Sequence, residues 1–174
     1  MDCFAPLAMT GKRVRRMPNT SAPIGPPVDA TPAPRPERRV FDGAHIRLEP
    51  LATAHARDLY EATHGEDRED IWRYLFTGPY PDFASFQNWV ANAAQLADPL
   101  AWAVIDTSGK AVGALTLMRI DAPNRVVEVG GITYGTPLQH TTGSTEAIYL
   151  LARYIFELGY RRFEWKCNDL NAPS

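Results

Sequence analysis

The sequence contains only two cysteines, Cys3 and Cys167, among its 174 residues. They form no C-x-x-C pair and cannot supply a disulfide framework, which suits a reducing cytosol. The four histidines show no metal-ligand spacing with one another or with cysteine. We therefore expect a cytoplasmic protein without a metal site.

Long apolar runs are also missing. Arg153 interrupts even the most apolar stretch, residues 147–160, and no run approaches the roughly 18 residues that a membrane-spanning helix needs. The basic cluster near the N-terminus follows a short apolar patch, which is the reverse of the order in a signal peptide. The sequence thus predicts no membrane partner, and its 45% apolar and 22% charged content is typical of one globular domain.

Proline and charge are distributed unevenly along the chain. Eight of the 15 prolines lie in the first 36 residues, and residues 1–40 carry seven Lys or Arg against three Asp or Glu. The remaining residues carry 11 against 17, a poor match for nucleic acid and a mild match for a cationic substrate such as an amine. We expect a proline-rich, disordered arm over residues 1–39 and one domain over residues 40–174.

Hydrophobic periodicity predicts a mixed α/β domain. The expected strands are residues 45–50, 100–106, 111–120, 126–134 and 161–167, and the expected helices are residues 53–64, 66–75, 83–93 and a helix that Gly159 ends. Short turns join the strands over residues 100–134, which indicates an antiparallel meander. The strand, helix and strand that follow form a crossover, which joins parallel strands.

Two glycine-containing segments point to function. The doublet Gly130-Gly131 lies inside a predicted strand, where glycine marks a bulge or a close approach by another backbone or a ligand. Residues 139–145, Gln-His-Thr-Thr-Gly-Ser-Thr, lie where a helix begins. Such an end is either a phosphate-binding site or an ordinary Ser/Thr N-cap. The segment matches neither a Walker loop nor G-x-G-x-x-G, which disfavours nucleotide hydrolysis and dinucleotide redox chemistry.

From about residue 39 to residue 174 the sequence resembles the GNAT superfamily of acetyl-CoA dependent N-acetyltransferases. It looks most like the branch that includes the ribosomal-protein N-terminal acetyltransferases. The family's loop reads Gln/Arg-x-x-Gly-x-Gly/Ala, and here Gln139 matches, Thr142 replaces a glycine and Ser144 replaces a glycine or alanine. The segments 126–130, 145–147 and 161–174 are also similar to the family. The β-branched Thr142 implies that the loop bends or that coenzyme A binds more weakly.

The resemblance implies a GNAT-like mixed sheet, with helices on both faces and a cleft where two parallel strands separate. Acetyl-CoA would be the co-substrate and a primary amine, of a small molecule or of a protein N-terminus, the acceptor. The residues implied in binding the coenzyme are Ile132, Thr133, Tyr134, Gln139, His140, Thr141, Thr142, Gly143, Ser144, Thr145, Asn168 and Asn171. Glu128 is the candidate general base, with an ion pair on a solvated sheet face as the alternative. Tyr134 is either a general acid or a residue of the cleft wall, and we favour the wall.

The resemblance also predicts that the sequence is truncated, because in the family a helix and a two-stranded hairpin follow the Asn-rich segment. The strand over residues 161–167 would then be an uncovered edge. Two alternatives to an N-acetyltransferase stay open: a non-catalytic coenzyme A-binding or interaction module, and an inactive fragment. The acidic residues 66–70 are either a solvated helix face or a site that attracts a cationic acceptor. The oligomeric state, including a homodimer, stays open too.

Overall fold

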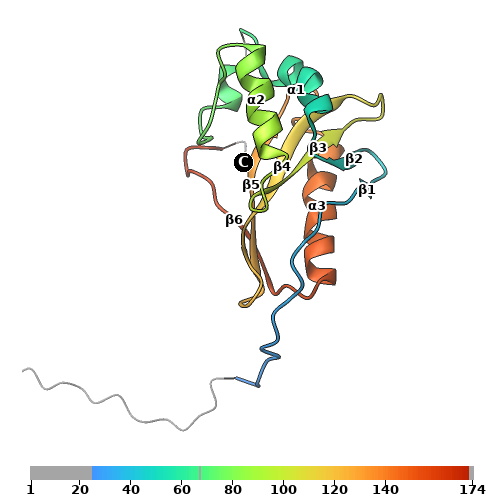
Figure 1. Cartoon of the computed structure of the whole chain (residues 1–174), viewed down its shortest axis with the longest axis vertical. Helices are drawn as coiled ribbons and strands as arrows, with labels where there is room; N and C mark the ends of the chain where they lie inside the picture. The colour runs from blue at the N-terminus through green and yellow to red at the C-terminus, as the bar shows by residue number, and fades with distance from the viewer. Residues whose placement is uncertain (1–24, 67, 173–174) are drawn as a thin grey trace, which may run out of the picture.

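The computed structural model describes residues 25–66 and 68–172. The first 24 residues of the proline-rich arm lie outside the described residues, together with Cys3 and the basic cluster. Figure 1 shows a curled sheet with α1 and α2 over one face and α3 against the other. This is the mixed α/β fold that the sequence predicts.

Six strands form one sheet in which the order in space follows the order in the chain. They are β1 (Phe41–Asp42), β2 (Arg47–Pro50), β3 (Leu100–Ile105), β4 (Ala111–Asp121), β5 (Val126–Tyr134) and β6 (Arg162–Trp165). The pairs from β1 to β5 are antiparallel, and β5 pairs with β6 in parallel. The predicted meander and the parallel pair are both confirmed. The two-residue strand β1 was not predicted, because two residues are too few to show alternation.

The helical segments are η1 (Thr53–His55), α1 (Ala56–Thr63), η2 (Glu69–Ile71), α2 (Phe83–Ala93) and α3 (Thr142–Glu157). The helix predicted over residues 66–75 is wrong, because among the described residues of this range only η2, a short 3-10 helix, forms. Its Trp72 is buried, and the indole Nε1 donates a hydrogen bond to the Thr63 carbonyl oxygen over 2.9 Å. This contact with the end of α1 holds the segment in turns.

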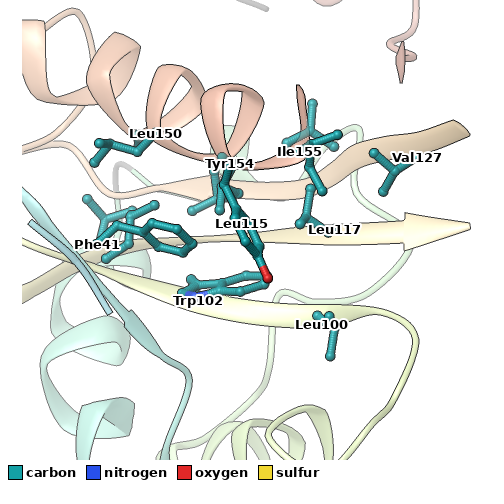
Figure 2. Close-up of a cluster of buried hydrophobic side chains, with 14 of the residues drawn as sticks. Phe41, Leu100, Trp102, Leu115, Leu117, Val127, Leu150, Tyr154 and Ile155 are labelled. Atoms are coloured by element: carbon teal, nitrogen blue, oxygen red, sulfur yellow. The ribbon is translucent and has the colours of Figure 1, made fainter. Parts of the chain in front are cut away.

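Two hydrophobic clusters hold the layers together. The larger lies between the sheet and α3, where Trp102, Leu115 and Tyr154 meet (Figure 2). The smaller lies on the opposite face, where Phe86 and Val90 of α2 pack over the sheet. Both faces of the sheet are therefore covered by packed helices.

Part of the predicted arm lies against the domain. Residues 29–39 form no helix or strand, but the Arg125 guanidinium pairs with Asp29 over 2.5 Å and the Glu37 N–H donates to the Tyr154 hydroxyl over 2.8 Å. These contacts join the described end of the arm to the domain, and the disorder expected for residues 1–39 stays a prediction. The boundary between arm and domain stays a prediction.

No helix within residues 25–66 and 68–172 has the length and apolar character needed to cross a membrane.

Glu146 fastens the start of α3 to the turn before β2. Its carboxylate accepts hydrogen bonds from the backbone N–H groups of Ala44, His45 and Ile46 over 2.7, 2.8 and 3.0 Å. Gly43 allows this approach, because a Cβ there would lie 2.6 Å from the Glu146 carboxyl carbon. Burial alone would raise the pKa of Glu146, but the three N–H donors outweigh it and hold the pKa below its ordinary value of 4.5.

We expect Glu146→Ala to lower the free energy of unfolding by about 2 kcal/mol, because it leaves three backbone donors without their charged acceptor. The lowered pKa means that the carboxylate stabilises the fold above its unfolded-state pKa and that this stabilisation is lost as pH falls through the folded pKa. Urea melts at neutral pH and near pH 3 should therefore show that the difference from wild type shrinks in acid. A difference of the same size at both pH values would contradict this role of Glu146.

His64 holds the segment between α1 and α2. Its Nε2 accepts the Tyr80 N–H over 3.2 Å, and its Nδ1 lies 3.1 Å from the Thr63 hydroxyl oxygen, which itself donates to the Leu59 carbonyl oxygen. These partners assign the proton of the neutral ring to Nδ1. The ring stacks on Tyr60 with centroids 4.2 Å apart, and burial lowers the pKa of His64 below 6.5.

We expect the free energy of unfolding to decrease as pH falls below about 6.5. In this range His64 takes up a proton in the unfolded chain, whereas burial keeps it neutral in the folded chain. The variant His64→Gln keeps an acceptor for Tyr80 and should lose this part of the pH dependence. Chemical denaturation between pH about 7.5 and 5.5 measures it in both proteins. If both proteins lose the same stability on acidification, His64 is not the source of the effect.

Candidate active site

A cavity of about 1010 Å³ lies where the two parallel strands separate. The pairing of β5 with β6 ends at Val129 and Trp165, while β5 continues to Tyr134. The lining comes from residues 69–75, which we call the η2 segment, and from β5, the loop before α3, the first turns of α3, the end of β6 and the turn at Asn171. The lining residues are Asp70, Ile71, Tyr74, Leu75, Ile132, Tyr134, Thr136, Gln139, His140, Thr141, Ser144, Thr145, Ile148, Tyr149, Trp165 and Asn171.

The glycine doublet bends β5 at the level where the strands separate. The β4–β5 register shifts between Ala114 and Thr116, opposite Gly130 and Gly131, and Gly131 has φ +55°. Glycine adopts this left-handed conformation without the cost that other residues meet. Of the two features that the doublet indicates, a bulge or a close approach by a backbone or ligand, the structure shows the bulge. Such a bulge increases the twist of the strand that carries it.

The N-terminus of α3 lies at the cavity. Thr141 is its N-cap: the hydroxyl oxygen accepts the Ser144 N–H over 3.3 Å and the hydroxyl donates to the Leu138 carbonyl oxygen over 2.7 Å. His140 has φ +57°, and the Gln139 amide donates to the Tyr134 carbonyl oxygen over 2.9 Å. Thr141 therefore caps α3 as an ordinary threonine N-cap. Because this helix end also lines the cavity, the positive end of the helix dipole faces the cavity.

Tyr134 forms a fixed part of the wall. Its hydroxyl donates to the Ser144 carbonyl oxygen over 3.0 Å, which joins β5 to the first turn of α3. Burial raises the pKa of Tyr134 far above its ordinary value of 10.0, so the phenol stays protonated. These contacts support the wall role, and the catalytic role of Tyr134 stays a prediction.

Eight of the residues predicted to bind the coenzyme line the cavity. They are Ile132, Tyr134, Gln139, His140, Thr141, Ser144, Thr145 and Asn171. Among the described residues, four that were predicted do not line it: Thr133, Thr142, Gly143 and Asn168.

Local packing explains these four. The side chain of Thr133 is buried away from the cavity, and its hydroxyl donates to the Gly131 carbonyl oxygen. Thr142 is the exposed first residue of α3. Gly143 is needed for packing, since a Cβ there would lie 2.7 Å from Ile46. The side-chain oxygen of Asn168 accepts a hydrogen bond from the Leu170 N–H over 2.9 Å, and this bond shapes the turn that carries Asn171.

Sequence reasoning named Asp70 within the acidic residues 66–70, as a solvated face or a site for a cationic acceptor, but it did not predict that residues 70–75 form a wall of the cavity. Asp70, Ile71, Tyr74 and Leu75 enter the cavity from this segment, and the Tyr74 hydroxyl donates to the Leu170 carbonyl oxygen over 3.2 Å. Only tertiary contacts bring this wall to the cavity. Ile148 and Tyr149 could have been found, since they lie one helical turn after Ser144 and Thr145.

Glu128 is placed differently from the coenzyme residues. It is 6% exposed, points to the face of the sheet opposite Val127 and Val129, and is not among the described lining residues. Its carboxylate pairs with Arg119 over 2.7 Å and with Lys166. Burial would raise the pKa of Glu128, but hydrogen bonds from these two cations lower it. Glu128 thus forms the ion pair that was the alternative to a general base, although its carboxylate is buried and not on a solvated face. Its role as a general base stays a prediction.

Within the part of the chain that the structure describes, no group of three or more His, Cys, Asp or Glu could hold a metal ion.

Comparisons with known proteins agree with this geometry. Residues 45–174 match the model of the acetyltransferase (GNAT) domain. A GCN5-related N-acetyltransferase from Brucella melitensis is 44% identical with a TM-score of 0.79, and the match covers 82% of this chain and 66% of that one. A GNAT-family protein from Chromobacterium violaceum is 32% identical with a TM-score of 0.76, and the match covers 87% and 79% of the two chains.

A more distant structure shows the fold alone. Spermidine N-acetyltransferase from Vibrio cholerae, in complex with CoA and spermine, is 18% identical with a TM-score of 0.56, and the match covers 71% of each chain. The comparison with curated proteins found no match. The family model covers well over half of the sequence, and the fold and the cavity fit it: the chain belongs to the GNAT acetyltransferase family.

Proposed function

We propose that this chain binds acetyl-CoA in the cavity between β5 and β6 and transfers the acetyl group to a primary amine. The observation that carries the proposal is the capped N-terminus of α3 beside the cavity, at the point where the parallel strands separate. A helix N-terminus binds phosphate through backbone N–H groups and the helix dipole. The family supports the same ligand.

The cavity residues fit such a ligand in chemistry and in size. Ser144 and Thr145 line the cavity in the first turn of α3. The N–H groups of Thr142 and Gly143 in the same turn have no partner within the helix, and this turn would hold the pyrophosphate. Ile132 on β5 and Asn171 on the opposite wall would flank the pantetheine arm. A volume of about 1010 Å³ is large enough for an extended ligand of this kind.

The reaction forms a C–N bond and breaks the C–S bond of the thioester. The neutral amine attacks the carbonyl carbon, its excess proton passes to a base, and the sulfur leaves as a thiolate that takes up a proton. Backbone N–H groups of residues 132–134 are proposed to stabilise the oxyanion. Glu128 is the proposed base. Because its carboxylate lies outside the cavity lining, the proton would reach it through water.

Ser144→Asp tests the phosphate site. A carboxylate at this position repels phosphate but suits the N-terminus of a helix, so the variant should fold normally. We expect saturating acetyl-CoA to raise the melting temperature of the wild type and to have much less effect on Ser144→Asp.

Ser85→Asp is the matched control, because Ser85 also donates its N–H to an N-cap side chain, that of Asp82 in α2. It should keep the full shift with acetyl-CoA. Equal shifts in all three proteins would show that the coenzyme does not bind at α3. No shift in a cooperatively folding wild type would reject the proposed function.

Glu128→Gln tests the general base. Loss of a base should lower kcat by about a hundredfold or more with little change in the KM for acetyl-CoA, and should remove the acidic limb of the pH profile. Glu164→Gln is the control, since Glu164 also pairs with Lys166 but is more exposed. A similar, small loss in both variants would show that Glu128 only supports β6.

A non-catalytic coenzyme A-binding module is the second candidate. The pairing of Glu128 with Arg119 and Lys166 favours it, because a carboxylate occupied by two cations is a weaker base. Both candidates predict acetyl-CoA binding, and only the enzyme predicts turnover. The ribosomal-protein branch, a protein N-terminus as acceptor and a homodimer stay predictions.

A further inference from the structure

The cavity lining contains one acidic side chain. Asp70 is the only carboxylate among the described lining residues, and none of those residues is a lysine or an arginine. The other lining groups are neutral side chains and His140. Tyr74 and Trp165 contribute aromatic rings that are 37% and 47% exposed. A carboxylate together with exposed aromatic rings is a combination that binds organic cations.

The backbone that carries Asp70 is fastened by neighbouring residues. It lies in η2, next to the segment that Trp72 and His64 fix against the end of α1. Two residues of the same wall, Tyr74 and Leu75, also face the cavity. Asp70 pairs with Arg73, but their side chains are 78% and 62% exposed, and exposed pairs contribute little to stability. A cationic ligand can therefore compete with Arg73.

The carboxylate does not suit the reacting nitrogen. An amine attacks only after it loses its proton, and a neighbouring carboxylate would stabilise the protonated form. Asp70 is therefore suited to a positive charge that stays on the acceptor throughout the reaction. The sequence after residue 40, with 11 basic and 17 acidic residues, also attracts cations.

We propose that the acceptor is a primary amine that carries a second positive charge, and that Asp70 binds this second charge. The inference rests on the proposed function and specifies its substrate class. Such a charge can belong to a small diamine or to a lysine side chain near the N-terminus of a peptide.

The test measures binding, so that it does not depend on turnover. Calorimetry with and without saturating CoA compares 1,4-diaminobutane with butylamine, and an Ala-Lys peptide amide with its Ala-norleucine counterpart. We expect the ligand with the second charge to bind about fivefold more tightly in at least one pair, since this corresponds to about 1 kcal/mol. The pair that shows the preference identifies the source of the charge.

Asp70→Asn should remove the preference and leave the affinity for CoA unchanged. Glu69→Gln, a neighbouring change in η2 outside the described cavity lining, should keep the preference. A preference that is missing from both pairs in the wild type, or that persists in Asp70→Asn, would overturn the proposal. Failure of the proposed function is a separate result, because there CoA itself would not bind.

Discussion

The packing of α3 against the sheet is the constraint on which the site depends. Ala147, Leu151 and Ile155 are fully buried against the face that carries Val127 and Val129. This contact fixes the crossover between β5 and β6, so the N-terminus of α3 must face the end of their pairing (Figure 1). Glu146 and Tyr134 add polar contacts at the same helix end. The cavity thus follows from the way in which one helix covers one sheet.

The two sides of the cavity have opposite electrostatic character. The α3 side offers the positive end of a helix dipole without a cationic side chain among the described lining residues, whereas the η2 side offers Asp70. In the proposed function, this division gives the phosphates and the acceptor separate places. The bulge at Gly131 lies just beyond the end of the pairing of β5 with β6. Binding of one substrate therefore need not compete with binding of the other.

Much of the fold could be predicted from the sequence because it depends on local patterns. The helical spacing of Ile148, Leu151 and Ile155 predicts α3, and Gly130-Gly131 predicts the bulge. The loop at residues 139–145 was found for the same reason, since capping residues adjoin a periodic segment. Most of its residues line the cavity.

The rest depends on contacts between distant residues. The wall around Asp70 exists because Trp72 bonds to the end of α1, and periodicity contains no trace of that bond. The partners of Glu128 lie on β4 and after β6, and Lys166 is 38 residues away. Alternation along β5 shows that Glu128 and its valine neighbours face opposite ways, but not which charges it meets.

The most direct measurement is a crystal structure of the chain grown with CoA. The pyrophosphate is expected on the backbone N–H groups of residues 140–145, with the pantetheine arm between β5 and the turn at Asn171. Coenzyme bound elsewhere on the molecule, with the N-terminus of α3 free of phosphate, would contradict the proposed site.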